Sequence, residues 1–281
     1  MSTILDNFNK KKNFLICIDS DGCAIDTMDI KHIKCFGPCM VEMWNLEQWQ
    51  DEILKSWNDV NLYTLTRGIN RFKGLAVALT EINEKYTKIE GLDEYLKWTN
   101  ETKELSNESL EAQIAKIDNE CLNKALEWSR NVNKSIDLLS EDDKKPFEGV
   151  KEGIIAASEM ADIAIVSSAN EKAVLDEWSQ HGLLEHVDIV LTQNVGSKAY
   201  CIAELLKKGY DRDNVLMVGD AVGDLDAAKV NKVLYYPIMV RKEKDSWSRF
   251  TKEVIGKFTT NSYAGEFEEK VISEFKENLT K

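Results

Sequence analysis

The chain has 281 residues, of which 43% are hydrophobic and 30% are charged, a composition typical of a globular protein with one large core and a second, smaller unit. Its 36 Lys and Arg residues stand against 49 Asp and Glu residues, so the net charge is −13 and a polyanion such as DNA is repelled overall. No run of residues approaches the roughly 18–20 uncharged apolar positions of a membrane span, so we expect neither a nucleic acid nor a membrane as partner, and the oligomeric state stays open.

The cysteines and the amino-terminal segment both favour a cytoplasmic location for the protein. The chain has six cysteines without paired spacing, which we interpret as reduced thiols: Cys17, Cys23, Cys35, Cys39, Cys121 and Cys201. Cys35 and Cys39 could in principle form a redox or metal pair, but they lack the C-x-x-C spacing and a second pair of ligands. The amino-terminal segment lacks the order of charge, apolar run and cleavage site of a signal peptide, so we expect a cytoplasmic protein.

Short apolar runs, each ending where polar or small residues begin, predict five strands. In chain order they occupy residues 13–19, 162–167, 187–191, 214–219 and 232–236. The runs are continuous rather than alternating, as in a parallel sheet that is covered on both faces. Helical patterns at 170–181, 197–208 and 223–230 separate the later strands. This alternation predicts a doubly wound, Rossmann-like α/β sheet, for which we expect the strand order 3-2-1-4-5.

Residues 24–145 interrupt this alternation between the first two strands. They carry helical periodicity and no convincing strand, and they are far longer than a normal crossover connection. One long helix is predicted from the spacing of Leu110, Ile114, Ile117, Cys121 and Ala125. We therefore expect an inserted all-helical cap domain at residues 24–145 and an α/β core formed by residues 1–23 and 146–281. Beyond about residue 245, the pattern predicts two further helices that pack on the sheet and carry no chemical signature.

Four aspartates follow strands of the predicted sheet. Asp19 ends the first strand and Asp21 comes two residues later, whereas Asp220 ends the fourth strand and Asp224 follows it. In open α/β sheets, ligands bind beyond the carboxyl ends of the strands where the strand order reverses, which here is between strands one and four. We therefore expect the four carboxylates to converge on one crevice. Three more polar residues follow strands two and three nearby: Ser167, Ser168 and Lys198.

Several carboxylates in one cleft repel each other unless a cation neutralises them. An all-oxygen ligand set selects a hard ion, and Mg²⁺ held by one or two carboxylates, phosphate oxygens and waters fits best. Mg²⁺ and Lys198 would then supply the local positive charge that a phosphate needs in a protein of net charge −13. Ser167 and backbone N–H groups could hold phosphate oxygens without adding charge.

The ordered set of motifs resembles the haloacid dehalogenase-like (HAD) phosphatase superfamily. The resemblance rests on Asp19-Ser-Asp21-Gly22 after an apolar strand, Ser167 after a second, then Lys198, then Gly219-Asp220-x-x-x-Asp224. It covers about residues 13–22 and 147–240, and a helical insert directly after the first motif is typical of the C1-capped branch. Cys23 and Ala24 depart from the pattern, since the family favours Thr and then Leu or Val, and the cap is longer than usual. The resemblance therefore does not carry over a substrate.

The resemblance implies a role for each motif residue. Asp19 would be the nucleophile that forms an aspartyl-phosphate, and Asp21 would protonate the leaving oxygen and then activate water. The phosphate-binding residues would be Ser167, Ser168, Lys198 and Gly22. The Mg²⁺ ligands would be Asp19, the backbone carbonyl of Asp21, Asp220 and Asp224.

A polar patch in the insert contains Arg67, Asn70 and Arg71. Two arginines four residues apart can share a helix face, and Gly68 allows a bend, so the patch could reach into the crevice and contact the substrate. A solvated helix start explains the same residues equally well, and both interpretations stay open.

Together these features predict an Mg²⁺-dependent phosphatase that acts on a small phosphorylated metabolite. A phosphomutase acting on a sugar phosphate would carry the same four motifs, and a bisphosphate intermediate or an isomerised product would distinguish it. The third hypothesis is a catalytically silent binding module on this fold, although an inactive site has no physical reason to retain mutually repelling carboxylates. A dehalogenase or phosphonatase is less expected, because those branches typically lack an acid at the position of Asp21.

Overall fold

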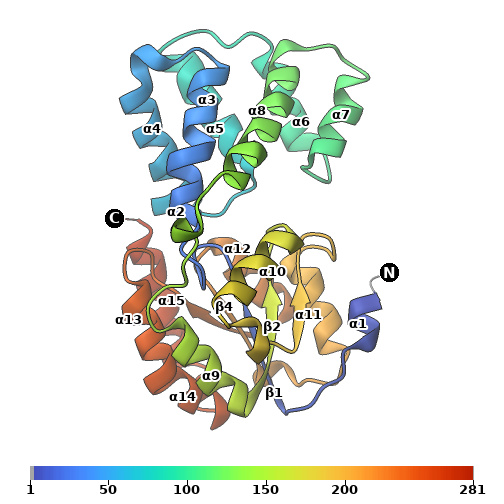
Figure 1. The fold of residues 1–281 in the computed structure, drawn as a ribbon, viewed down its shortest axis with the longest axis vertical. Coiled ribbons are helices and arrows are strands. Elements are labelled where there is room, and N and C mark those ends of the chain that lie inside the picture. The colour runs from blue at the N-terminus through green and yellow to red at the C-terminus, as the bar shows by residue number, and fades with distance from the viewer. Residues whose placement is uncertain (1–2, 281) are drawn as a thin grey trace. The chain divides into compact units, whose positions relative to one another are not determined.

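The computed structural model describes residues 3–280, which divide into two compact units (Figure 1). The first, here called the core unit, comprises Met1–Met28 and Glu141–Lys281, and the second, the helical unit, comprises Asp29–Ser140. Residues 24–28 and 141–145 thus group with the core unit, whereas the sequence pattern placed them in the insert. Backbone hydrogen bonds hold these connecting segments together, from Asp26 N to Lys145 O at 2.8 Å and from Phe147 N to Ala24 O at 3.1 Å.

The core unit contains a five-stranded parallel sheet in the order β3-β2-β1-β4-β5. The strands are β1 (Phe14–Ile18), β2 (Ala161–Val166), β3 (Ile189–Leu191), β4 (Val215–Gly219) and β5 (Leu234–Pro237). In the register, Ile16 of β1 lies between Ile163 of β2 and Leu216 of β4. The predicted doubly wound α/β fold and its strand order are confirmed, and the order reverses between β1 and β4.

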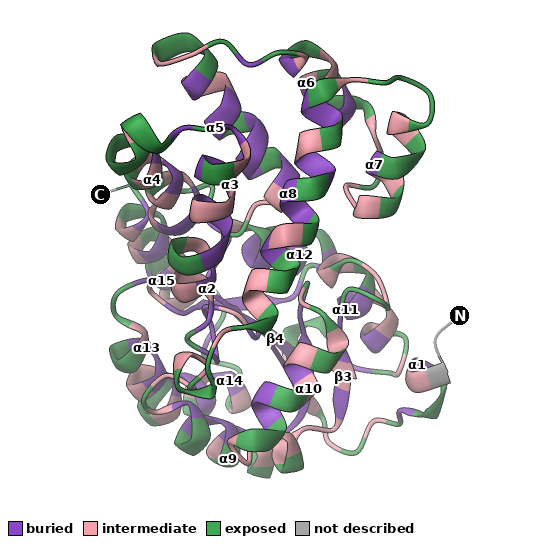
Figure 2. Cartoon of the chain, turned by 45° about the horizontal axis from the view of Figure 1, so that its top comes forward, coloured by how far each residue is buried: buried purple, intermediate pink, exposed green. Residues whose placement is uncertain are grey.

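Helices cover both faces of this sheet, which is why its strands are almost entirely apolar. One face packs against α9 (Val150–Met160), α10 (Glu171–Gln180), α13 (Glu243–Arg249), a π-helical turn (Phe250–Val254), α14 (Ile255–Thr259) and α15 (Glu266–Asn278). The other face carries α11 (Lys198–Leu206) and α12 (Val222–Asn231), which pack on each other and on the strands. Figure 2 shows the strands as largely buried ribbon, while helices such as α10 alternate buried and exposed residues.

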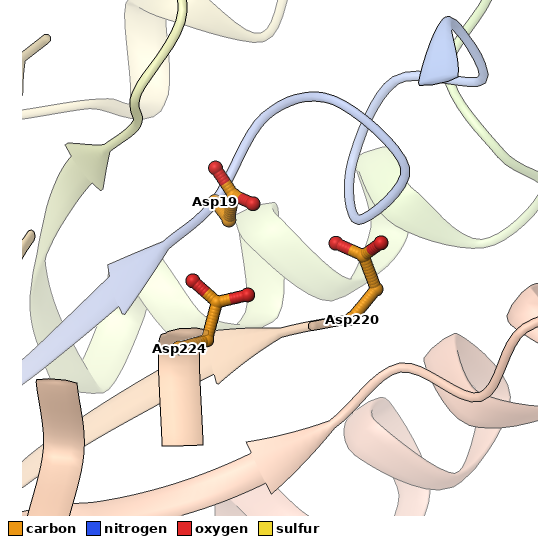
Figure 3. A group of neighbouring side chains, drawn as sticks. All are labelled: Asp19, Asp220 and Asp224. Atoms are coloured by element: carbon orange, nitrogen blue, oxygen red, sulfur yellow. The ribbon is translucent and has the colours of Figure 1, made fainter. Parts of the chain in front are cut away.

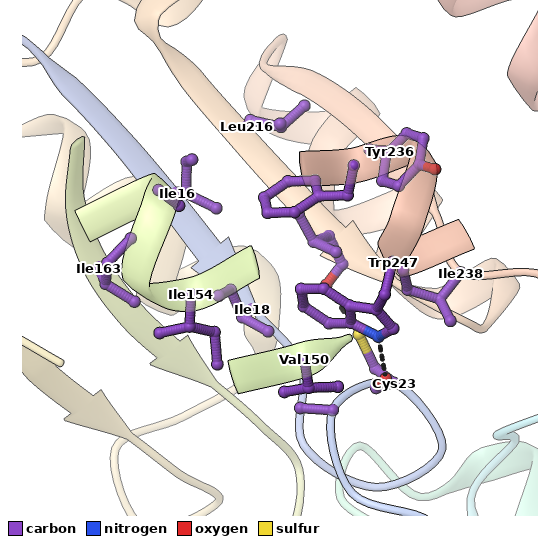
Figure 4. Close-up of a cluster of buried hydrophobic side chains, with 14 of the residues drawn as sticks. Ile16, Ile18, Cys23, Val150, Ile154, Ile163, Leu216, Tyr236, Ile238 and Trp247 are labelled. Atoms are coloured by element: carbon purple, nitrogen blue, oxygen red, sulfur yellow. Dashed lines mark hydrogen bonds between the residues drawn. The ribbon is translucent and has the colours of Figure 1, made fainter. Parts of the chain in front are cut away.

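The buried side chains of the first face form one continuous cluster (Figure 4). Alternate residues of each strand contribute to it, as Ile16 and Ile18 do from β1, because successive side chains of a strand point to opposite faces. Trp247 of α13 lies in the middle of this cluster and is fully buried. The carboxy-terminal helices are therefore part of the core on which the site rests.

The helical unit is a bundle around its own aromatic core. Its helices are α3 (Gly37–Met43), α4 (Gln50–Asn58), α5 (Arg71–Lys85), α6 (Leu92–Glu101), α7 (Asn107–Ile114) and α8 (Glu120–Asp137), and α2 (Met28–Lys31) leads into it. Tryptophans 57, 98 and 128 are buried there with Phe72, and Phe72 meets Trp98 edge-on at 5.2 Å between ring centroids. The tryptophans of this segment thus serve packing.

One predicted helix of this unit is wrong. The apolar spacing from Leu110 to Ala125 indicated a single helix, but α7 ends at Ile114 and α8 begins at Glu120. The Asn119 side chain caps α8 by accepting a hydrogen bond from Leu122 N at 3.0 Å, and Asn is a strong helix initiator. Ile117, between the two helices, is 36% exposed.

Among residues 3–280, no helix is long and apolar enough to cross a membrane. The six cysteines are free thiols, including Cys35 and Cys39.

Candidate active site

The first part of the site is the turn that follows β1. The carbonyl of Ser20 accepts backbone hydrogen bonds from Cys23, Ala24 and Ile25, at 3.3, 2.9 and 2.9 Å, which curls the chain tightly. Gly22 within it has φ of +79°, a conformation that favours glycine. Directly before the turn, Asp19 is tied to β4 by a bond from its N–H to Val218 O at 3.0 Å. Here "the loop" denotes residues 19–25.

The second part comes from the end of β4 and the start of α12. Asp220 directly follows β4, and Asp224 lies in the first turn of α12, where its Oδ2 accepts a hydrogen bond from Ala221 N at 3.1 Å. Gly219 makes room for this carboxylate, because a Cβ added there would lie 2.3 Å from Asp224 Cγ. A glycine at 219 is therefore a steric requirement for the position of Asp224.

These elements bring three aspartates together, as the strand order predicts (Figure 3). One carboxylate oxygen from each of Asp19, Asp220 and Asp224 lies within 4.8 Å of the other two. The residues are almost fully buried, with exposed fractions of 6%, 1% and 0%. Like charges this close and this dry destabilise one another unless a cation lies among them.

Lys198 is the cation that the chain itself places there. Its Nζ lies 2.7 Å from Asp19 Oδ2 and 2.6 Å from Asp224 Oδ1. It is the first residue of α11, and Ser197 caps that helix by accepting a hydrogen bond from Tyr200 N at 3.2 Å. Burial opposes the charge of Lys198, but the two aspartates outweigh it and raise its pKa above the ordinary value, so Lys198 stays an ammonium.

The electrostatics of the cluster leave a surplus of negative charge. Burial raises the pKa of Asp19 to about 6, with Lys198 opposing the rise and Asp224 adding to it. The pKa of Asp224 is also raised, first by burial and then by Asp220, against Lys198. When ionised, three carboxylates against one ammonium leave two negative charges, which suits a divalent cation with hard oxygen ligands. The donor set therefore fits Mg²⁺.

Asp21 differs from the three clustered aspartates in its exposure and in its hydrogen-bond partner. It is partly exposed, and its Oδ1 accepts a hydrogen bond from the Thr27 hydroxyl at 2.7 Å. A backbone bridge between Asp21 and Ile25 and a bond from Gly22 N to Ile25 O at 2.8 Å fix the backbone on both sides. Thr27 was not among the predicted site residues, because no spacing rule connects it to Asp21.

The two serines after β2 differ in their surroundings. Ser167 is buried, with 3% exposed, and its Oγ accepts a hydrogen bond from Ala169 N at 3.2 Å. Its own N–H donates to Leu191 O at 2.9 Å, which keeps it at the strand end. Ser168 is exposed. Since β2 neighbours β1, Ser167 ends its strand at the same edge of the sheet as Asp19.

The three predicted substrate-contacting residues of the insert have partners within the helical unit. Arg67 is 2% exposed, and its Nη1 lies 2.9 Å from Leu62 O and 3.4 Å from Asp29 Oδ1. Asn70 caps α5 by accepting a hydrogen bond from Phe72 N at 2.9 Å.

Arg71 is held in a similar way. Its Nη1 donates to Asn133 Oδ1 at 2.7 Å, and its guanidinium lies 5.0 Å from the ring centroid of Phe36. Burial lowers the pKa of Arg71 to about 10. These contacts explain why Arg67, Asn70 and Arg71 are polar, and a role in substrate binding stays a prediction.

The comparison with protein families identifies the class. The family model of haloacid dehalogenase-like hydrolases matches residues 69–236, more than half of the chain. The matched segment contains Ser167, Lys198, Asp220 and Asp224 and begins after Asp19. The chain belongs to the haloacid dehalogenase-like hydrolases, and it is therefore an enzyme of the hydrolase class.

One solved structure agrees with this fold. A haloacid dehalogenase-like family hydrolase from Streptococcus pneumoniae superposes with a TM-score of 0.50 at 10% sequence identity, over 85% of this chain and 91% of that chain. A protein named as a predicted phosphatase from Clostridium acetobutylicum has a TM-score of 0.49 at 14% identity, over 94% of this chain and 100% of that chain. No curated protein matches the sequence.

Proposed function

We propose that this hydrolase is an Mg²⁺-dependent phosphatase that cleaves a small-molecule phosphomonoester through an aspartyl-phosphate at Asp19. The observation that carries the proposal is the cluster of Asp19, Asp220 and Asp224 at the carboxyl edge of the sheet, with Lys198 in contact with Asp19 and Asp224. A buried carboxylate nucleophile beside a fixed positive charge suits attack on an anionic phosphoryl group. The same residues suit acyl transfer or glycosyl transfer less well.

Asp19 is the nucleophile in this proposal. The Ser20 N–H donates to Asp19 Oδ1 at 2.8 Å and Lys198 contacts Oδ2, so both oxygens are oriented before substrate binds. One carboxylate oxygen forms a bond to phosphorus while the ester oxygen–phosphorus bond breaks, and the leaving oxygen takes a proton. Lys198 offsets the negative charge of the nucleophile and of the phosphoryl group as they approach.

Asp21 is the acid and base of the same proposal. Its carboxyl protonates the leaving oxygen and then takes a proton from the water that cleaves the aspartyl-phosphate, which restores Asp19 and releases inorganic phosphate. The Thr27 hydroxyl holds this carboxyl in one orientation through its hydrogen bond to Oδ1. Partial exposure lets Asp21 exchange protons with solvent, which the buried Asp19 cannot do as readily.

The residues that would hold Mg²⁺ are Asp19, the backbone carbonyl of Asp21, Asp220 and Asp224. When bound, the ion supplies charge neutralisation for the phosphoryl oxygens in a protein of net charge −13. Ser167, Ser168 and Gly22 would donate to phosphate oxygens beside Lys198, and of these Ser167 is already fixed at its strand end.

The insert would select the substrate. By the sequence pattern it spans residues 24–145 and acts as a cap of the C1 type, with Arg67, Asn70 and Arg71 as the proposed contacts. The proposed substrate is a small phosphorylated metabolite. A cytoplasmic location stays a prediction, which the free thiols favour.

Hydrolysis of a phosphomonoester panel and of p-nitrophenyl phosphate tests the proposal directly. We expect turnover with Mg²⁺, loss of turnover with a chelator, and recovery when Mg²⁺ is restored. Acid quenching during turnover should trap phosphate on the chain in a bond that hydroxylamine cleaves, as an acyl-phosphate requires. An active enzyme that is indifferent to chelation, or that yields no trapped phosphate, would contradict the metal or the covalent step respectively.

A further inference from the structure

Two buried indoles from outside the motifs donate hydrogen bonds to the loop. Trp178 of α10 donates from Nε1 to Ser20 Oγ at 2.9 Å, across 158 positions of the chain. Trp247 of α13 donates from Nε1 to the Cys23 carbonyl at 2.9 Å, across 224 positions, as the dashed line in Figure 4 shows. Both tryptophans are fully buried.

The residues that pack around Trp247 leave room for its side chain. A Cβ added to Gly153 of α9 would lie 2.9 Å from Trp247 Cε3, and one added to Gly149 would lie 3.2 Å from Trp247 Cβ. Trp247 also meets Phe250 edge-on, with 5.2 Å between ring centroids. Gly149, which caps α9, and Gly153 within that helix thus leave the space through which α13 brings its indole to the loop.

The two indole hydrogen bonds hold the turn that carries the reacting groups at two points, Ser20 and Cys23. Ser20 lies between Asp19 and Asp21, and Cys23 follows Gly22 in the same turn. The internal bonds of the turn, which converge on the Ser20 carbonyl, shape it but do not place it relative to the sheet. An indole N–H has one donor in a rigid ring, so a buried indole is a precise anchor for a backbone or hydroxyl oxygen.

We propose that Trp178 and Trp247 are positioning residues, which hold the loop so that Asp19 and Asp21 face the phosphoryl group. The proposal rests on the proposed phosphatase function and adds that two residues of α10 and α13, outside the motifs, are needed for full turnover. Misplacing a reacting group by about 1 Å can cost about 100-fold in rate, so loss of either bond is felt mainly in kcat.

Trp247→Phe removes the N–H donor and keeps an aromatic ring in the cluster. We expect kcat to fall by about 10-fold to 100-fold with KM little changed. The matched control is Tyr263→Phe, which removes a buried hydroxyl that donates to the Tyr235 carbonyl at 2.6 Å in the same helical layer but does not touch the loop. The control should lose comparable thermal stability and keep the wild-type kcat.

The Trp178 bond is tested by a double-mutant cycle that does not depend on filling the core. Ser20→Ala removes the acceptor on the loop side and leaves the indole in place, whereas Trp178→Phe removes the donor. If the bond positions the loop, the double variant should be no slower than the slower single variant. Independent, multiplying losses in kcat would show that the two residues act separately and would overturn this half of the proposal.

Amide hydrogen exchange of the loop gives a readout that needs no turnover. The N–H groups of Cys23, Ala24 and Ile25 should exchange about tenfold faster in Trp247→Phe than in wild type or Tyr263→Phe, because one anchoring hydrogen bond is lost. Unchanged exchange in Trp247→Phe, or equal acceleration in the control, would overturn the proposal.

The two proposals fail in distinguishable ways. A wild-type protein that hydrolyses no phosphate ester contradicts the proposed function, and the exchange experiment still decides whether the indoles position the loop. An active wild type whose Trp247→Phe and Trp178→Phe variants keep the wild-type kcat contradicts the positioning role alone.

Discussion

The two edges of the same sheet both bury aspartates, but they surround them differently. At the amino edge, Asp162 at the start of β2 accepts hydrogen bonds on Oδ2 from Lys11 N at 2.9 Å, from Lys12 N at 3.0 Å and from the Tyr210 hydroxyl. Asp162 is fully buried, so these donors replace its water. Its hydrogen bonds link the segment before β1 to β2 and to the segment before β4.

At the carboxyl edge, three buried aspartates lie together, and two of them share one lysine. Asp19 and Asp224 both contact Lys198, and Asp220 lies within the same group of oxygens. A buried carboxylate whose oxygen accepts three hydrogen bonds links the segments that donate them, whereas a group of carboxylates with surplus charge costs stability and is retained for what it binds. The comparison separates a structural aspartate from candidate catalytic ones without reference to any motif.

The largest expected effect is that of Asp19→Asn. Because the amide cannot form the aspartyl-phosphate, kcat should fall by about 10⁴-fold or more, in the range found for a removed nucleophile. The fold should persist, since the change removes one of three repelling charges. Steady-state kinetics and far-UV circular dichroism measure both effects, and a variant as active as wild type would refute the covalent step.

Asp21→Asn should have the next largest effect. Loss of a proton-transfer group costs roughly 10²–10⁴-fold in kcat, and the partly exposed position of Asp21 predicts no loss of thermal stability. Thr27→Val, which removes the hydroxyl that donates to Asp21 at 2.7 Å, is the matched control for orientation alone. We expect its loss to be smaller, and a loss as large as that of Asp21→Asn would mean that Thr27 does more than orient the acid.

Asp162→Ala should act on stability instead of rate. Three donors lose their acceptor, of which the Tyr210 hydroxyl is buried and the Lys11 and Lys12 N–H groups are part-buried, and a fully buried unsatisfied group costs about 1–3 kcal/mol, so we expect a loss of about 2–3 kcal/mol in the free energy of unfolding. Urea unfolding measures it, and Tyr210→Phe, which removes a single donor, should cost less. The folded protein should keep the wild-type kcat. A loss of kcat without a loss of stability would contradict the distinction between the structural Asp162 and the candidate catalytic aspartates.

The smallest expected effect is a pH dependence of stability that arises at Asp19 on the carboxyl edge. Burial raises the pKa of Asp19 from 3.8 to about 6, so the folded, metal-free protein binds a proton there more tightly than the unfolded chain. This stabilisation is complete below about pH 4 and is lost as the pH rises through about 6. In chelator, the melting temperature of wild type relative to Asp19→Asn should therefore fall across this window, and a rise would contradict the assigned sign.

Local patterns were enough to predict the architecture of the core unit. Continuous apolar runs predict strands covered on both faces, and parallel strands place residues such as Asp19 and Asp220 at one edge, so the meeting of the aspartates could be inferred before any coordinates. The break between α7 and α8 could not, because apolar spacing continued across it and the cap at Asn119 competed with that spacing locally.

Contacts between distant parts of the chain required the tertiary structure. That Arg67 and Arg71 have partners within the helical unit depends on Asp29, Asn133 and the ring of Phe36, which no spacing rule connects to them. The division of the chain at Met28 and Glu141 likewise depends on pairing between segments about 120 residues apart, such as Ala24 with Phe147.

The amino-acid sequence by itself thus determined the fold class, the order of the strands and the chemical character of one edge of the sheet, because periodicity and strand ends are local properties of the chain. Only the tertiary structure decided that Lys198 bridges Asp19 and Asp224, and that Trp178 and Trp247 donate to the loop. The role of a buried ammonium or indole depends on the acceptor to which it donates, and that acceptor lies far away in the sequence.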